Sequence, residues 1–122
     1  MKGIGVDLIK IQRIKGLCAR HGEKALARLF TPGEIRYAKT KKLWWQHLAA
    51  RFAAKEAVYK AFGGGKELAN WKEIEVINAA DGRPCVVLHG AAKKKSEALG
   101  VKKIEVSLTH SEDHAVGVAI LL

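Results

Sequence analysis

The longest helical pattern in the sequence runs from His47 to Gly65, HLAARFAAKEAVYKAFGGG, and the other elements are interpreted around it. Good helix formers fill this segment until three glycines, which are typical of a helix end. At about 100° per residue, the larger side chains share one side of the helix: Leu48, Phe52, Lys55, Glu56 and Tyr59. Small side chains, which allow another element to approach closely, share the opposite side: Ala50, Ala54, Ala57 and Ala61.

Charged residues lie inside or beside the apolar stripe of this predicted central helix: Arg51, Lys55, Glu56 and Lys60. Burying a charge is costly unless it is paired or holds a metal. Glu56 and Lys60 have the i, i+4 spacing of an ordinary ion pair, so pairing within the helix is one interpretation. A metal site is the other.

The N-terminal residues 3–9 alternate in character, which predicts a short strand with Ile4, Val6 and Leu8 facing a core. Gly3, Gly5 and Asp7 then share the other face. A carboxylate beside two residues without side chains leaves room for a ligand or a second chain, but Asp7 can equally cap the following helix.

A helix is predicted from about Lys10 to Gly22, with an apolar stripe formed by Ile11, Ile14, Leu17 and Cys18. Arg13, Arg20 and Lys24 form a second, wholly basic stripe on the same predicted helix, and we expect it to dock an acidic partner. Another helix begins at Thr31, because Thr31-Pro32-Gly33-Glu34 combines an N-cap, a first-turn proline and a capping box. It ends near Lys39.

The second half of the chain is dominated by strand patterns. Residues 71–77 and 85–88 form a predicted hairpin around Asp81-Gly82, with Pro84 at a strand start, and a helix follows over 91–99. Two further strands, 103–108 and 115–122, flank a polar turn at 109–114. Helices and strands segregate, so we expect one α+β domain, 1–122, with a small antiparallel sheet packed around the central helix.

Charge and composition limit the classes of ligand and the cellular location that fit this chain. The 122 residues carry a formal net charge of +10, which attracts polyanions such as nucleic acid, an anionic membrane, an acidic protein or a phosphate-rich ligand. Only 7% of residues are aromatic and no nucleic-acid-binding motif is present. Cys18 and Cys85 lie far apart, and we expect them to be small buried residues in a reducing compartment. With no membrane-length apolar run and no expected secretory signal, the predicted location is cytoplasmic.

Four segments occur in the order of a known family: GVDLIKIQRI, RFAAKEAVYKAFGGG, IEV…DGRPCV and SLTHSEDHAVGVAI. The sequence resembles, essentially from end to end, the holo-acyl-carrier-protein synthases, the small bacterial type of phosphopantetheinyl transferase. RFAAKEAxxKAxG is the specific part of the signature. The resemblance implies Mg²⁺-dependent transfer of 4'-phosphopantetheine from coenzyme A to a serine of apo acyl carrier protein, in support of fatty acid biosynthesis. It also implies a homotrimer with sites between protomers.

The resemblance also assigns roles to individual residues. It implies that Asp7 and Glu56 hold Mg²⁺ on the pyrophosphate and that Lys60 lies near the phosphate being transferred. From the chemistry of the residue types, we expect Glu56 to remove the serine proton, directly or through a water on the metal. The predicted coenzyme A contacts are Arg51, Lys60, Gly63, Gly64, Gly65, Arg83, Pro84, Thr109 and His110. The predicted carrier-protein contacts are Arg13, Leu17, Arg20 and Lys24.

The residue types suit this chemistry, since Mg²⁺ prefers one or two carboxylates together with phosphate oxygens and water. Phosphoryl transfer depends mainly on positioning and charge stabilisation. Two alternatives remain open. One is a small basic nucleic-acid-binding domain without catalysis, in which Asp7 and Glu56 are structural. The other is a protein that binds coenzyme A without transfer.

Overall fold

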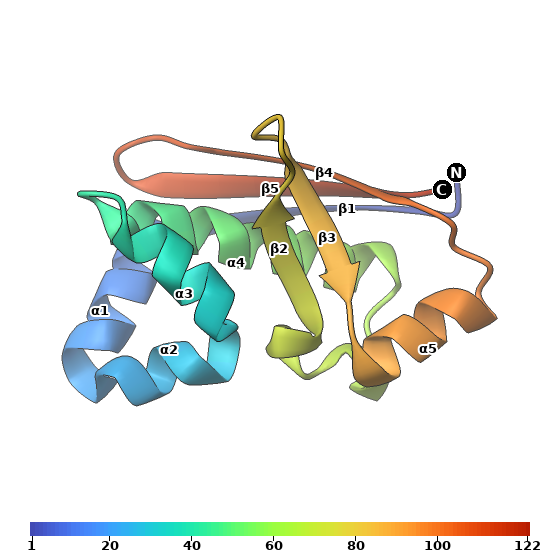
Figure 1. Ribbon diagram of the computed structural model, residues 1–122, viewed down its shortest axis with the longest axis horizontal. Coiled ribbons are helices and arrows are strands. Elements are labelled where there is room, and N and C mark those ends of the chain that lie inside the picture. Colours follow the sequence, from blue (N-terminus) through green and yellow to red (C-terminus); the bar gives the residue numbers. More distant parts are fainter.

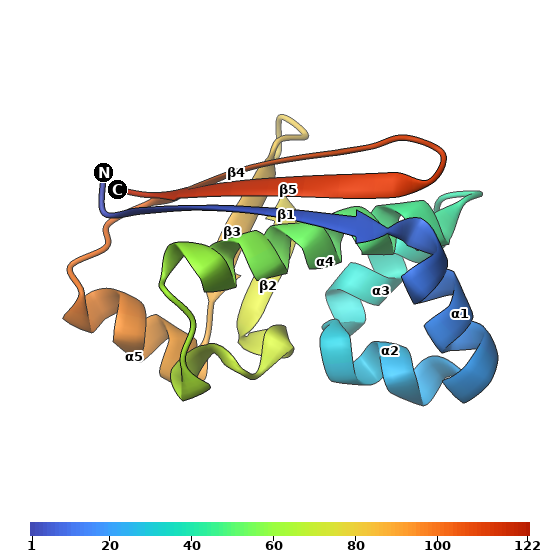
Figure 2. The same cartoon turned by 180° about the vertical axis from the view of Figure 1, so that it is seen from behind.

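A computed structural model describes residues 1–122, and its centre is the helix α4 (Trp44–Ala61). On one side of α4 lies an antiparallel sheet with the order β1-β5-β4, made of β1 (Gly3–Lys10), β4 (Ile104–His110) and β5 (His114–Leu121). The remaining elements cover its other side (Figures 1 and 2). The predicted α+β fold with a small antiparallel sheet around a central helix is confirmed.

The elements on the far side of α4 form two groups (Figure 1). One group contains the helices α1 (Ile11–His21), α2 (Glu23–Leu29) and α3 (Pro32–Lys39). The other contains the hairpin of β2 (Ile74–Asn78) and β3 (Pro84–Leu88), followed by α5 (Gly90–Ala98). Short 3-10 turns at Lys66–Leu68 and Trp71–Glu73 connect α4 to this hairpin.

The sheet packs directly on the small side chains of α4. A Cβ atom built on Gly5 would collide with the backbone of Ala57, and one built on Gly117 would collide with the backbone of Ala53. Glycine at these two positions therefore allows β1 and β5 to lie against the helix backbone. The small alanine side chains predict that another element approaches this side of the helix closely. In the structure that element is the sheet.

The predicted orientation of β1 is wrong. Ile4, Val6 and Leu8 are exposed, at 60%, 58% and 63%, whereas Gly5, Asp7 and Ile9 face α4 and are buried. An alternating pattern defines two faces but not which of them is inward. The inward face is the one with glycines because the strand lies too close to the α4 backbone at Gly5 for a side chain to fit there.

Three other expectations need correction. Gly22, with φ 71°, separates α1 from α2, so Lys24 lies on α2 and not on the helix of Arg13 and Arg20. The polar turn predicted at 109–114 is shorter, because β4 continues to His110 and β5 begins at His114. Cys18 and Cys85 are partly rather than fully buried.

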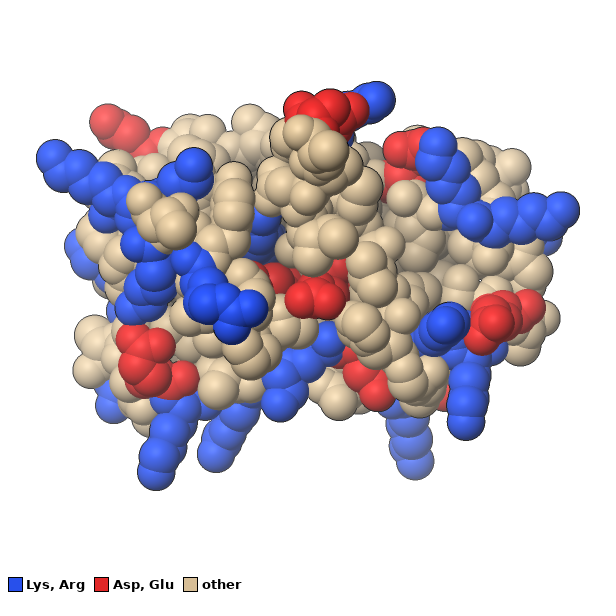
Figure 3. Space-filling view, in the orientation of Figure 1, with Lys and Arg blue, Asp and Glu red and all other residues tan.

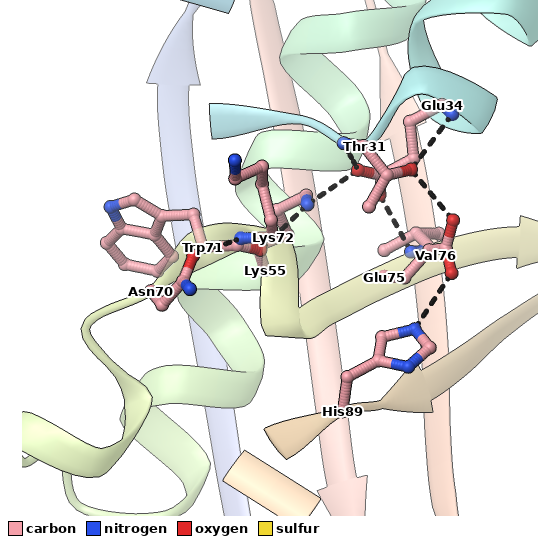
Figure 4. Close-up of polar contacts among 9 residues, drawn as sticks. All are labelled: Thr31, Glu34, Lys55, Asn70, Trp71, Lys72, Glu75, Val76 and His89. Carbon is pink, nitrogen blue, oxygen red and sulfur yellow. Dashed lines mark hydrogen bonds and ion pairs between the residues drawn. The ribbon is translucent and has the colours of Figure 1, made fainter. Parts of the chain in front are cut away.

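A buried polar network joins the elements on the far side of α4 (Figure 4). Lys55 Nζ lies 2.7 Å from Glu34 Oε1, and both side chains are completely buried. Lys55 also donates to the Trp71 carbonyl, while Glu34 accepts from the amides of Thr31 and Val76. The capping box predicted at Thr31 is confirmed, and the same glutamate that closes it neutralises Lys55.

Candidate active site

Asp7, Glu56 and Lys60 converge where β1 crosses α4. Asp7 lies on the buried face of β1, and its Oδ1 accepts a hydrogen bond from Lys60 Nζ at 2.9 Å. Lys60 also donates to the Val6 carbonyl at 3.3 Å. The ion pair that spacing suggested between Glu56 and Lys60 is therefore replaced by one between α4 and β1.

The ionisation of Glu56 depends on the neighbouring Asp7. Burial raises the pKa of the Glu56 carboxyl, and the neighbouring charge of Asp7 and a hydrogen bond with it raise that pKa further. The positive charges of Lys60 and Arg13 oppose this shift. Two carboxylates this close repel each other when both are ionised, so the pair favours a proton or a cation between its members.

These two carboxylates are the donors available for a metal here, since no cluster of three or more potential ligand side chains occurs in the chain. Such a set is poor for zinc, which takes three or four protein ligands. It suits Mg²⁺, which keeps several waters and completes its shell with substrate phosphate oxygens. The residues present therefore fit the metal that the sequence implied.

The glycine segment follows directly after this group. The amide of Gly63 donates to the Lys60 carbonyl at 2.9 Å, and that of Gly64 donates to the Tyr59 carbonyl at 2.9 Å. Gly63, Gly64 and Gly65 all have positive φ values, of 80°, 76° and 115°. Side chains other than glycine rarely adopt such angles, so the turn needs glycine at all three positions.

Arg51 and His110 belong to a second group of side chains. Arg51 Cζ lies 4.3 Å from the centre of the Tyr37 ring, and its Nη2 donates to Asn78 Oδ1. Arg51 Nε is buried without a hydrogen-bond partner. The His110 ring lies 5.6 Å from the ring of His47, one helical turn before Arg51.

The remaining predicted coenzyme A contacts lie around this second group. Asn78 pairs with Pro84 in the β2–β3 ladder and donates to the Gly82 carbonyl at 2.9 Å, so the hairpin tip adjoins Arg51. Arg83 is exposed, and its Nη2 forms an ion pair with Asp81 Oδ2 at 2.8 Å. Thr109 precedes His110 on β4.

Positive charge dominates the second group. Burial lowers the pKa of His47, and the nearby His110, Lys41 and Arg51 lower it further. None of these four side chains takes part in an ion pair. The excess of positive charge in this group suits an anionic ligand.

The two groups occupy opposite edges of the three-stranded sheet. Asp7 is on β1 and His110 is on β4, and β5 lies between these strands. One chain thus brings Asp7, Glu56 and Lys60 together, and separately Arg51 and His110 beside His47. The glycines follow Lys60 along the chain, whereas Arg83, Pro84 and Thr109 are neighbours in sequence or in the strand ladder of residues in the second group. Sequence reasoning missed His47, Tyr37 and Asn78. Only the i, i+4 spacing of His47 and Arg51 could have indicated a relationship.

The predicted carrier-protein contacts lie on α1 and α2. Arg13 and Arg20 are exposed on α1, and Arg13 is close enough to affect the ionisation of Glu56. Leu17 and Lys24 line a hollow of about 460 Å³ between the two helices. Lys and Arg side chains gather over the α1–α3 end of the face in Figure 3, while acidic residues are scattered.

Known proteins with similar sequences match nearly the whole chain. A holo-acyl-carrier-protein synthase of Solibacter usitatus is 45% identical over 118 residues, 96% of this chain and 93% of its own length. A holo-acyl-carrier-protein synthase of Moorella thermoacetica is 44% identical over 117 residues, 96% of this chain and 91% of its own length.

Solved structures with the same fold carry the same enzyme name. The crystal structure of the Neisseria meningitidis synthase has a TM-score of 0.91 and 29% identity, and the match covers 100% of this chain and 98% of that one. The Helicobacter pylori synthase in complex with coenzyme A has a TM-score of 0.85 and 30% identity, over 98% and 99% of the two chains. A family model of the 4'-phosphopantetheinyl transferase superfamily matches residues 3–119. This chain therefore belongs to the 4'-phosphopantetheinyl transferase superfamily, and it is a transferase as its motifs predicted.

Proposed function

We propose that this protein transfers 4'-phosphopantetheine from coenzyme A to a serine hydroxyl of apo acyl carrier protein, releasing adenosine 3',5'-bisphosphate. The observation that carries the proposal is the convergence of Asp7, Glu56 and Lys60 in a chain of this family. A role in fatty acid biosynthesis and a cytoplasmic location belong to the same proposal. The structure contains no helix long and apolar enough to cross a membrane.

Asp7 and Glu56 would hold Mg²⁺, which when bound neutralises the pyrophosphate and polarises the phosphorus under attack. The close carboxylate pair and the raised pKa of Glu56 support this assignment, because a cation between the two groups relieves their repulsion. Lys60 supplies a further positive charge beside Asp7.

Glu56 accepts the proton of the attacking serine in the proposed reaction. Lys60 stabilises the negative charge that develops on the leaving bisphosphate. The hydrogen bond with Asp7, followed by the Asp7 charge, raises the pKa of Lys60, so the ammonium group stays protonated for this task.

A complete site would be formed between two copies of the chain. The exposed face of β1 adjoins that of β5 through the pairs Ile4–Ile120, Val6–Val118 and Leu8–Val116, which form one apolar surface. Exposed apolar surfaces of this kind are typical of subunit interfaces. In a homotrimer packed through it, the β4 edge of one protomer, with Arg51 and His110, would meet the β1 edge of the next, with Asp7 and Lys60.

The carrier protein would dock on α1 and α2, beside the β1 edge. Arg13 and Arg20 supply exposed positive charge, and Leu17 and Lys24 line the adjacent hollow. An acidic carrier helix complements this surface, and its serine would then lie near Glu56. Opposite charges of this kind mainly accelerate association and select the partner.

Intact-mass analysis tests the proposed function. The protein is incubated with an apo carrier protein, coenzyme A and Mg²⁺, and the control contains a chelator in place of the metal. Appearance of the phosphopantetheine mass on the carrier, only with Mg²⁺, is the expected result. Binding of coenzyme A without transfer would instead indicate a binding protein. Salt-dependent binding of generic DNA without transfer would favour the nucleic-acid-binding alternative.

A further inference from the structure

Lys95 is the one lysine of the run Lys93–Lys95 that is turned inward. Lys93 and Lys94 are exposed, whereas the Lys95 side chain is only 21% exposed. Its Nζ donates to the carbonyl oxygen of Gly64 at 2.7 Å. The segment after α4 runs down toward α5 (Figure 2), so this contact joins α5 to the glycine segment.

Lys95 and Glu67 enclose Gly65. Their charged atoms, Nζ and Oε2, lie 3.7 Å apart. A Cβ atom built on Gly65 would lie 2.8 Å from the Lys95 Nζ and 2.7 Å from the Glu67 Oε2, so a larger residue would displace the ends of these two side chains. The position favours glycine because of its φ of 115°, which other residues rarely adopt.

The contact fixes the orientation of one peptide group. The Gly64 carbonyl and the Gly65 amide belong to the same planar trans peptide, so the N–H points in the direction opposite to the C=O. With the carbonyl held on Lys95, the Gly65 N–H points away from α5. A peptide between two glycines otherwise rotates with little steric resistance, because neither residue has a Cβ.

The Gly65 amide is free to bind a ligand. Neither it nor the following Lys66 amide donates a hydrogen bond within the protein. Both residues are exposed, and the segment begins directly after the turn of α4 that carries Lys60. A backbone amide without a partner in the protein can donate a charge-assisted hydrogen bond to an anionic oxygen of a ligand.

We propose that Lys95 is a positioning residue that locks the Gly64–Gly65 peptide with its N–H directed to an anionic oxygen of coenzyme A. This inference rests on the proposed function, because it assumes that the glycine segment contacts that substrate. Lys95 itself contacts no reacting atom. Its effect is on substrate binding, through the fixed direction of one donor.

The test compares Lys95→Met with Lys94→Met, which removes the adjacent exposed lysine, and with Lys95→Arg, which keeps a charged donor. We expect Lys95→Met to raise the KM for coenzyme A several-fold, with kcat and the KM for the carrier protein nearly unchanged. Lys94→Met should change none of the three constants. Lys95→Arg should recover most of the coenzyme A affinity.

A second measurement reports directly on the order of the Gly64–Gly65 peptide. In the Lys95→Met protein, ¹⁵N relaxation should show lower order parameters at Gly64 and Gly65, with no change along α4. Unchanged order at both glycines overturns the proposal, and so does a change of kcat with coenzyme A KM unaffected. If the unaltered protein transfers no phosphopantetheine, the proposed function fails. The relaxation data then decide alone whether Lys95 orders this peptide.

Discussion

Lys60 Nζ contacts Asp7 Oδ1 at 2.9 Å, although 53 residues separate the two side chains in sequence. This contact ties the α4 helix to β1 at the place where both candidate metal ligands lie. It also leaves Glu56, one helical turn earlier, without Lys60 as its direct partner. The two carboxylates and the ammonium group can therefore be tested separately by substitution.

Loss of either carboxylate should abolish transfer while the fold remains intact. Asp7→Ala or Glu56→Ala leaves one carboxylate for Mg²⁺, and we expect a rate lower by at least about 100-fold, the scale of losing a charge-stabilising group. Intact-mass time courses at limiting Mg²⁺ measure the rate, and circular dichroism checks the fold. A near-normal rate in either variant would show that the pair is wrongly assigned.

Lys60 should act on the transition state rather than on substrate binding. Lys60→Ala removes the cation that stabilises the leaving bisphosphate, so kcat should fall by about 100- to 1,000-fold with little change in coenzyme A affinity. Steady-state kinetics and equilibrium binding separate the two effects. A loss confined to KM would move Lys60 into the group of binding residues.

Arg13 should govern carrier docking, because it is exposed on α1 and lies near Glu56. Reversing its charge with Arg13→Glu should raise the KM for the carrier several-fold, weaken the dependence of the rate on salt, and leave the coenzyme A KM almost unchanged. Lys94→Glu, on α5, is the matched control and should change neither the KM for the carrier nor the KM for coenzyme A. Impaired coenzyme A binding with normal carrier affinity would instead place this surface at the nucleotide.

The buried Lys55–Glu34 pair should be essential for stability. Lys55→Met leaves the Glu34 carboxylate completely buried without its cation, and breaking such a pair costs about 3–5 kcal/mol in the free energy of unfolding. Urea denaturation measures this loss. Lys39→Met, which breaks the exposed pair with Glu23, should cost only about 0–1 kcal/mol. Equal losses in the two variants would argue against a special role for the buried pair.

His47 should make stability depend on pH. Burial, followed by nearby positive charges, lowers its pKa in the folded protein, so the unfolded chain binds the proton more readily. Stability should therefore decrease as the pH falls below the ordinary histidine value of about 6.5 toward the lowered pKa. His47→Gln should reduce the stability difference between pH 7.5 and pH 5.5 in urea denaturation. His21→Gln, at an exposed site, controls for loss of a histidine, and an unaltered difference in His47→Gln would contradict the assignment.

The sequence by itself determined the elements whose signals are local. The helix of residues 44–61 and its glycine end, the capping box at Thr31 and the hairpin at Asp81-Gly82 each follow from residues close together in the chain. Backbone propensity and capping act over a few residues, so these patterns could be read without the fold. The family signature likewise indicated Asp7, Glu56 and Lys60 as candidate site residues.

Only the tertiary structure decided which faces and partners these elements use. Alternation along β1 left its inward face undetermined, and the close approach of Gly5 to Ala57 decided it. Helical spacing suggested that Lys60 pairs with Glu56, but β1 brings Asp7 closer to its ammonium group. His47 and His110 meet only because β4 folds back beside the start of α4. Such contacts depend on packing between distant segments, and no local pattern in the sequence encodes them.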